Sequence, residues 1–238
     1  MEQEELKRNL ERVRERIEKA CERAGRGADE VKLVAVSKTK PAQLIQMALQ
    51  LGQYDFGENY AQELRDKAQI IQDPKIRWHF IGTLQRNKVK YLVGRVVLIH
   101  SVDSPSLIDE IEKRAGKAGI KMPILIEVKL SPEETKAGTS PDELISLAQY
   151  ALEKEHIELK GLMTMPPYFP DPEQARPYYI QLRKLKEKLE KELGKTLPEL
   201  SMGMSNDFEV AIEEGATIIR VGTAIFGARE KCQVSALG

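Results

Sequence analysis

The chain has 238 residues, a hydrophobic fraction of 41%, and 37 basic and 37 acidic residues that leave no net charge at pH 7. This length suits one large domain, since α/β barrels commonly reach about 250 residues undivided. The balanced charge argues against a nucleic-acid partner. No apolar run approaches the roughly 18 residues that span a bilayer, which argues against a membrane protein.

The N-terminus and the cysteines indicate the compartment. The first residues, MEQEEL, are charged where a secretory signal has an apolar core, so we expect a cytoplasmic protein. Cys21 and Cys232 are the two cysteines, and they lack metal-ligand spacing. We therefore expect neither a structural disulfide nor a metal site.

The first 24 residues are predicted to form an amphipathic helix. Its apolar residues recur at steps of three and four, which places them on one stripe of a helix: Leu6, Leu10, Val13, Ile17 and Ala20. This stripe must pack against the rest of the domain or against another chain.

Beyond this helix, short apolar runs alternate with amphipathic stretches. Strands are predicted at 31–36, 54–56, 78–81, 96–99, 124–128, 159–163, 197–200 and 218–221. Helices are predicted at 41–51, from 60 onward, at 87–93, 105–118, 141–152, 173–193 and 207–214, and in a short segment after the last strand. Strands that alternate with helices form parallel βαβ units, and eight units favour a closed barrel over an open sheet. We predict an α/β fold, a TIM (β/α)8 barrel with an additional N-terminal helix (1–24), as a single domain over 1–238.

In such barrels the functional site is formed by the loops at the C-terminal ends of the strands. Lys38, which ends the first predicted strand, is the central candidate. A lysine partly removed from water can lose its proton near neutral pH and form an imine with a carbonyl compound. A solvated or salt-bridged lysine is the alternative.

Two loops are candidates for binding an anion. Ser205 and Asn206 precede a predicted short helix whose first N–H groups suit a phosphate, although Asn206 and Glu209 together also fit a capping box. Gly222 and Thr223 follow the eighth strand, where barrels often bind phosphate.

Arg220 lies two residues before Gly222 and therefore projects to the same side of the strand. There its guanidinium could donate to a pyridine nitrogen. An ion pair inside the barrel is the alternative.

Several motifs, in order along residues 31–227, resemble those of the pyridoxal phosphate homeostasis proteins, which are related to the PLP-binding barrel of alanine racemase. They are VAVSKT at 34–39, GENY at 57–60, WHFIGTLQ at 78–85, GLM at 161–163, SMGMS at 201–205 and RVGTAIFG at 220–227. One departure is Asn206, which precedes Asp207 where many relatives carry paired aspartates.

The resemblance implies that pyridoxal 5'-phosphate (PLP) is the cofactor and that Lys38 holds it as a Schiff base. It places Ser205, Gly222 and Thr223 on the phosphate and Arg220 on the ring nitrogen. It also implies a place near the cofactor for three further residues, for which packing or an indirect role stays equally open: Asn59, His79 and Met202.

Transamination is disfavoured, because an arginine on the ring nitrogen keeps that nitrogen unprotonated and weakens the electron sink. Racemisation needs a second acid–base group opposite the lysine, and alanine racemases take it from an appended β-domain that this sequence lacks. We therefore expect a non-catalytic PLP carrier that buffers the cofactor, with transient delivery to PLP-dependent apo-enzymes, and we expect a monomer.

Two other functions remain open from the sequence. One is a small PLP-dependent amino-acid racemase that uses Lys38 with Tyr60, His79 or another residue at the mouth as its second base. The other is an aldolase that uses Lys38 without a cofactor. Lys129 and Lys136 lie near the predicted mouth, where either could take the aldehyde during handover or be a solvated surface lysine.

Overall fold

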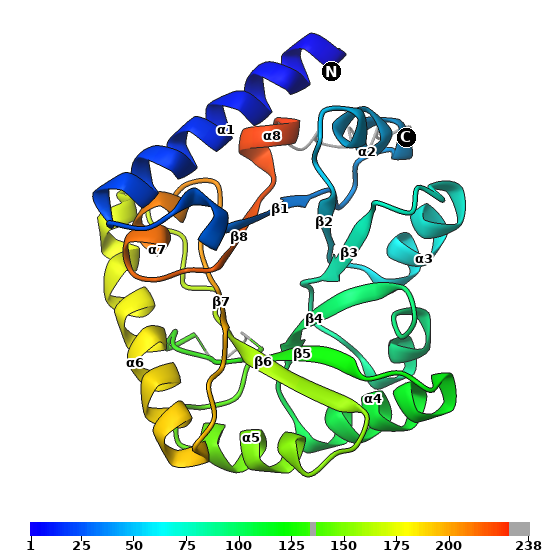
Figure 1. Cartoon of the computed structure of the whole chain (residues 1–238), viewed down its shortest axis with the longest axis vertical. Coiled ribbons are helices and arrows are strands. Elements are labelled where there is room, and N and C mark those ends of the chain that lie inside the picture. The colour runs from blue at the N-terminus through cyan, green and yellow to red at the C-terminus, as the bar shows by residue number, and fades with distance from the viewer. Residues whose placement is uncertain (134–136, 229–238) are drawn as a thin grey trace, which may run out of the picture.

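The computed structural model describes residues 1–133 and 137–228 and contains a closed barrel of eight parallel strands in sequence order (Figure 1). The strands are β1 (Lys32–Val36), β2 (Asp55–Glu58), β3 (Arg77–Phe80), β4 (Val96–Val102), β5 (Met122–Glu127), β6 (Ile157–Met163), β7 (Glu199–Ser201) and β8 (Ile218–Val221). The last strand pairs with the first, and Val34 lies opposite Arg220. The predicted TIM barrel is confirmed.

Helices surround the barrel (Figure 1). They are α1 (Gln3–Arg23), α2 (Ala42–Gln50), α3 (Ala61–Ile70), α4 (Pro105–Ala118), α5 (Leu144–Leu152), α6 (Arg176–Leu193), α7 (Phe208–Glu213) and α8 (Thr223–Phe226), with short 3-10 segments η1 (Ala28–Glu30), η2 (Arg86–Tyr91) and η3 (Pro172–Ala175). The helix predicted at 87–93 is present as the 3-10 helix η2. This segment contains the tighter i to i+3 bonds, such as Lys88 N–H to the Gln85 carbonyl at 3.0 Å.

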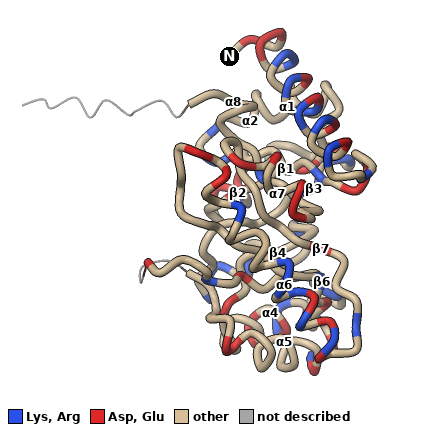
Figure 2. Tube along the Cα trace, turned by 90° about the vertical axis from the view of Figure 1, so that its left-hand side faces the viewer, with Lys and Arg blue, Asp and Glu red and all other residues tan. Residues whose placement is uncertain are grey.

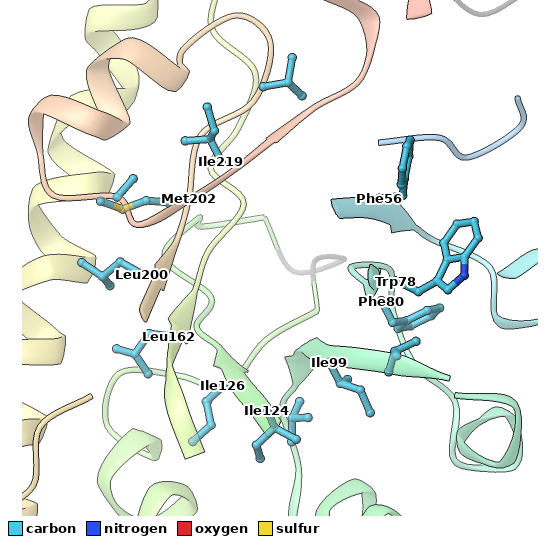
Figure 3. Close-up of a cluster of buried hydrophobic side chains, with 14 of the residues drawn as sticks. Phe56, Trp78, Phe80, Ile99, Ile124, Ile126, Leu162, Leu200, Met202 and Ile219 are labelled. Carbon is cyan, nitrogen blue, oxygen red and sulfur yellow. The ribbon is translucent and has the colours of Figure 1, made fainter. Parts of the chain in front are cut away.

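The main hydrophobic core lies between the strands and the helices, because alternate strand residues point out of the barrel. Figure 3 shows such side chains pointing from the strands towards the surrounding helices, among them Phe56, Ile124 and Met202. A second, smaller apolar layer fills the barrel interior: Val34, Leu98, Leu125, Met163 and Ile218. Residues two positions further along these strands therefore point inward near the C-terminal mouth.

The N-terminal helix α1 packs along the outside of the barrel, beside α7, α8 and α2 (Figure 1). It buries the predicted stripe Leu6, Leu10, Val13, Ile17 and Ala20, which is confirmed. Basic and acidic residues alternate along its remaining surface (Figure 2). Within the described residues, no helix combines the length and the apolar character that a membrane span needs.

Candidate functional site

A cavity of about 370 Å³ lies at the C-terminal mouth of the barrel. Six of the eight residues predicted to bind the cofactor line this cavity: Lys38, Asn59, Ser205, Arg220, Gly222 and Thr223. His79 and Met202 do not line it. Met165 and Tyr168 contribute to its rim, and the Tyr168 side chain is largely exposed.

Lys38 lies on a turn in an unusual backbone conformation. Thr39, the next residue, has φ of 64°, the left-handed region that a β-branched residue rarely adopts. The turn is held from both sides, because the Thr39 N–H donates to Glu63 Oε1 at 2.6 Å and the Ser37 carbonyl accepts from Lys67 Nζ at 2.7 Å. The direction in which Lys38 leaves the strand is thus fixed by α3.

A buried ion-pair cluster anchors this turn. Lys67 Nζ, on α3, also donates to Glu58 Oε1 at 2.6 Å and to Glu63 Oε1 at 2.7 Å. Ser37 Oγ donates to the same Glu58 oxygen at 2.7 Å. Burial raises the pKa of Glu58, and the ammonium of Lys67 opposes that rise. These contacts join β1, β2 and α3 directly beneath Lys38.

Asn59 enters the cavity from the end of β2. Its Oδ1 atom is buried and accepts no hydrogen bond from the described residues. Gly82 lies so close that a Cβ there would come within 2.2 Å of the Asn59 carbonyl oxygen. The glycine therefore lets the chain after β3 pack against the Asn59 backbone, and the buried Asn59 Oδ1 is left without a hydrogen bond from the described residues.

The loops after β7 and β8 meet beside the cavity, as predicted. Ser205 Oγ accepts a hydrogen bond from the Ala224 N–H at 3.2 Å, which ties the two loops together. The predicted capping box is absent: Asp207 is the N-cap of α7, and Asn206 donates instead to the Phe169 carbonyl at 2.6 Å.

The glutamate of the predicted capping box also has a different partner. Glu209 pairs with Arg16 of α1. Tertiary contacts thus replace the local cap, and they leave the Ser205 hydroxyl at the cavity wall.

Arg220 lies inside the barrel with its guanidinium at the cavity floor, and the residue is 3% exposed. It donates through Nη1 to Ser201 Oγ and through Nη2 to the Thr164 carbonyl, the latter at 3.0 Å. A guanidinium has five N–H groups, so donors remain for a ligand.

His79 is buried in the barrel interior. It is hydrogen-bonded to Asp55 at 2.8 Å and to His100 at 2.9 Å. Met202 points outward into the core beside Leu200 and Ile219 (Figure 3). Neither side chain is placed to touch a ligand in the cavity, so their role in binding stays a prediction.

Glu127, at the end of β5, is a residue that the sequence analysis did not single out. It lines a neighbouring cavity of about 260 Å³ together with Lys129 and Thr83. Burial and the nearby carboxyl of Asp103 raise the pKa of Glu127 to about 7. The signal available in the sequence was spacing, since Glu127 follows the inward-facing Leu125 by two residues.

The other candidates lie away from the cavity or outside the described residues. Tyr60 is 58% exposed and lines a separate cavity with Gln85 and Lys88. Lys136 and Cys232 lie outside the described residues. Cys21 is buried as a free thiol on α1.

Comparisons with known proteins agree with this geometry. The family described as the N-terminal domain of alanine racemase matches residues 8–230. A pyridoxal phosphate homeostasis protein of Aquifex aeolicus is 53% identical over 221 residues, which cover 93% of this chain and 97% of the relative. Another from Vibrio cholerae is 37% identical over 229 residues, which cover 94% of this chain and 97% of the relative.

Solved structures show the same fold. PipY of Synechococcus elongatus PCC7942, solved with PLP bound, is 34% identical with a TM-score of 0.83, and the match covers 93% of this chain and 100% of PipY. An alanine racemase of Clostridium difficile 630 is 15% identical with a TM-score of 0.73, which covers 96% of this chain and 58% of the racemase and is a likeness of fold alone. The chain therefore belongs to the alanine racemase N-terminal domain family and, within it, to the pyridoxal phosphate homeostasis proteins.

Proposed function

We propose that this chain binds PLP in the mouth cavity through Lys38 and acts in PLP homeostasis, buffering the cofactor and delivering it to PLP-dependent apo-enzymes. One observation carries the proposal: a single cavity brings together a lysine amine, a hydroxyl-lined loop pair and a buried guanidinium. Relatives named for PLP homeostasis and the PLP-bound PipY structure support it.

The residues around the cavity fit the parts of PLP. The Ser205 hydroxyl and the loop of Gly222 and Thr223 suit the phosphate, and a Cβ at Gly222 would lie 3.3 Å from the Val36 Cβ, crowding the space beside β1. Arg220 would donate to the ring nitrogen, and Asn59 lines the same cavity. When bound, PLP supplies an aldehyde that forms a Schiff base with a lysine amine.

A carrier suits these residues better than a racemase does. The Arg220 guanidinium keeps its protons, which leaves the electron sink of the bound cofactor weak. His79, a candidate second base, is 1% exposed and already hydrogen-bonded on both ring nitrogens. Tyr60, the other candidate, lines a different cavity. Racemisation is therefore not favoured.

The test is the visible spectrum of the purified protein with PLP, before and after borohydride, followed by peptide mapping of the reduced pyridoxyl group. We expect absorbance near roughly 420 nm and modification of Lys38. Lys38→Ala should abolish both, whereas the control Lys40→Ala, two residues away, should keep both. A colourless protein that ignores added PLP would favour the aldolase, and a pyridoxyl group on another lysine would refute the proposed site.

Catalysis and delivery are tested separately. Sustained formation of D-isomers from L-alanine or L-serine, lost in Lys38→Ala, would overturn the non-catalytic reading. Delivery predicts that the loaded protein reactivates an apo-enzyme faster than the same total PLP does in the presence of a scavenger of free aldehyde. A pyridoxyl adduct on Lys129 after borohydride would support a second lysine in handover, and light scattering tests the proposed monomer.

A further inference from the structure

A line of buried polar side chains crosses the barrel interior behind Arg220. Ser201 Oγ lies 2.8 Å from His100 Nδ1, His100 Nε2 lies 2.9 Å from His79 Nδ1, and His79 Nε2 lies 2.8 Å from Asp55 Oδ1. Arg220 and the four residues of this line are each at most 5% exposed. We call Asp55, His79, His100 and Ser201 the polar relay. It runs from the cavity floor to the opposite end of the barrel, where Asp55 also pairs with Arg77.

When both imidazoles are neutral, the chemistry of the two ends fixes the direction of every hydrogen bond in the relay. Arg220 can only donate, so Ser201 Oγ accepts from it. The Asp55 carboxylate can only accept, so His79 donates through Nε2. His79 Nδ1 then accepts from His100 Nε2, and His100 Nδ1 accepts the Ser201 hydroxyl proton. No donor faces another donor, and both imidazoles carry their proton on Nε2.

The charge states agree with this assignment. Burial lowers the pKa of both histidines, that of His100 most strongly, so both rings are neutral near pH 7. Burial alone would raise the pKa of Asp55, but hydrogen bonds from His79 and Arg77 hold it at about 2. The relay therefore connects a buried guanidinium to an ionised carboxylate through two neutral rings and one hydroxyl.

We propose that the polar relay positions Arg220: through the Ser201 hydroxyl it holds the guanidinium in the orientation in which it faces the cavity. Buried polar groups cost stability unless each finds a partner. Aliphatic side chains fill the neighbouring layer of the same barrel, so packing alone does not require imidazoles here. The inference rests on the proposed function, because it concerns the donor that PLP's ring nitrogen would meet.

The first experiment uses the cofactor-free protein and nitrogen-15 NMR of its histidines. We expect His79 and His100 to be neutral Nε2–H tautomers with slowly exchanging ring protons. Asp55→Asn should change the tautomer of His79, because an amide can donate where the carboxylate only accepted. Nδ1–H tautomers or a protonated ring in the wild-type protein at pH 7 would overturn the relay.

The second experiment compares PLP with its analogue in which the ring nitrogen is replaced by C–H. A hydrogen bond to a charged donor predicts that the wild-type protein prefers PLP by about tenfold or more in Kd. Ser201→Ala and Asp55→Asn should each reduce that preference several-fold. Ser201→Thr, which keeps the hydroxyl, and Arg77→Gln, which leaves the relay intact, should retain it. If Ser201→Ala does not fold, Asp55→Asn tests the same coupling between the polar relay and Arg220 from the Asp55 end.

The outcomes separate the two proposals. Binding of PLP with an unchanged preference in the folded relay variants, or an equal loss for both ligands, would overturn the positioning role and leave the proposed function standing. Failure of the wild-type protein to bind PLP would overturn the proposed function and this inference together.

Discussion

The ion-pair cluster beneath Lys38 allows a quantitative prediction from one substitution, Lys67→Met. The Lys67 ammonium donates to Glu58 Oε1 at 2.6 Å, and the Glu58 side chain is fully buried. Without Lys67, burial would drive Glu58 to bind a proton. Holding the carboxyl protonated at pH 7, against its ordinary pKa of 4.5, costs about 3 kcal/mol at roughly 1.36 kcal/mol per pH unit. That figure agrees with the roughly 3–5 kcal/mol found when one partner of a buried ion pair is removed.

The assay is urea unfolding followed by circular dichroism at several pH values. In Lys67→Met the folded pKa of Glu58 exceeds its unfolded pKa, so stability is highest at low pH and is lost as the pH rises above 4.5. The stability of Lys67→Met should therefore fall by about 2–3 kcal/mol between pH 5 and pH 7, and wild type, in which Lys67 opposes the rise in the Glu58 pKa, should lose less, so the deficit of the variant grows with pH.

Two further variants serve as comparisons for Lys67→Met. The double variant Glu58→Gln/Lys67→Met should recover much of the stability and lose the pH dependence, because no buried charge remains. Lys113→Met, on the exposed surface of α4, is the matched control and should stay within about 0.5 kcal/mol of wild type. A deficit in Lys67→Met that is equal at pH 5 and pH 7, or smaller than about 1 kcal/mol at pH 7, would refute this reasoning.

Three further predictions concern residues around the cavity. Because Glu127 has a pKa of about 7, the folded protein keeps a proton that the unfolded chain releases above pH 4.5. The free energy of unfolding should therefore fall by about 3 kcal/mol as the pH rises from 4.5 to 7. Glu127→Gln should remove this pH dependence when unfolding is measured in urea. Gly82→Ala should weaken PLP binding in a spectroscopic titration, because the new Cβ would lie 2.7 Å from Asn59 Cα and displace Asn59. An unchanged affinity would mean that PLP binding does not need Asn59 in this position. Thr39→Gly should raise the melting temperature, because glycine adopts the left-handed conformation without the strain of about 1 kcal/mol that Thr39 has there. A lower melting temperature would show that the turn is not strained.

The fold could be predicted because the hydrophobic pattern that indicates it is local in the sequence. Apolar runs mark the strands, and their alternation with amphipathic stretches predicts the barrel. Strand ends were harder: β4 was predicted to stop at residue 99 but continues to Val102. His100 and Ser101 look like loop residues in the sequence, yet the barrel buries both. The His100 ring is satisfied by partners on β3 and β7, which no window along the sequence can show.

The same distinction between local signals and long-range contacts applies to the residues of the candidate site. Lys38, Arg220 and Gly222 could be placed because each follows or ends a strand, and barrel geometry directs such positions to one mouth. Lys67 could not, because in the sequence it is an ordinary lysine on a charged helix, four residues after Glu63. Only the packing of α3 against β2 makes it the anchor of the Lys38 turn.

The docking of α1 has a consequence for how the protein is made. Asn9 donates to the carbonyl of Ile225, 216 residues away, and Arg16 pairs with Glu209. Helix α1 is synthesised well before α7 and α8, so its apolar stripe stays uncovered until those later segments have left the ribosome. Contacts between such distant parts of a chain slow folding, and surface left exposed in the interval is prone to aggregation. We expect nascent chains stalled before residue 208 to need chaperone protection.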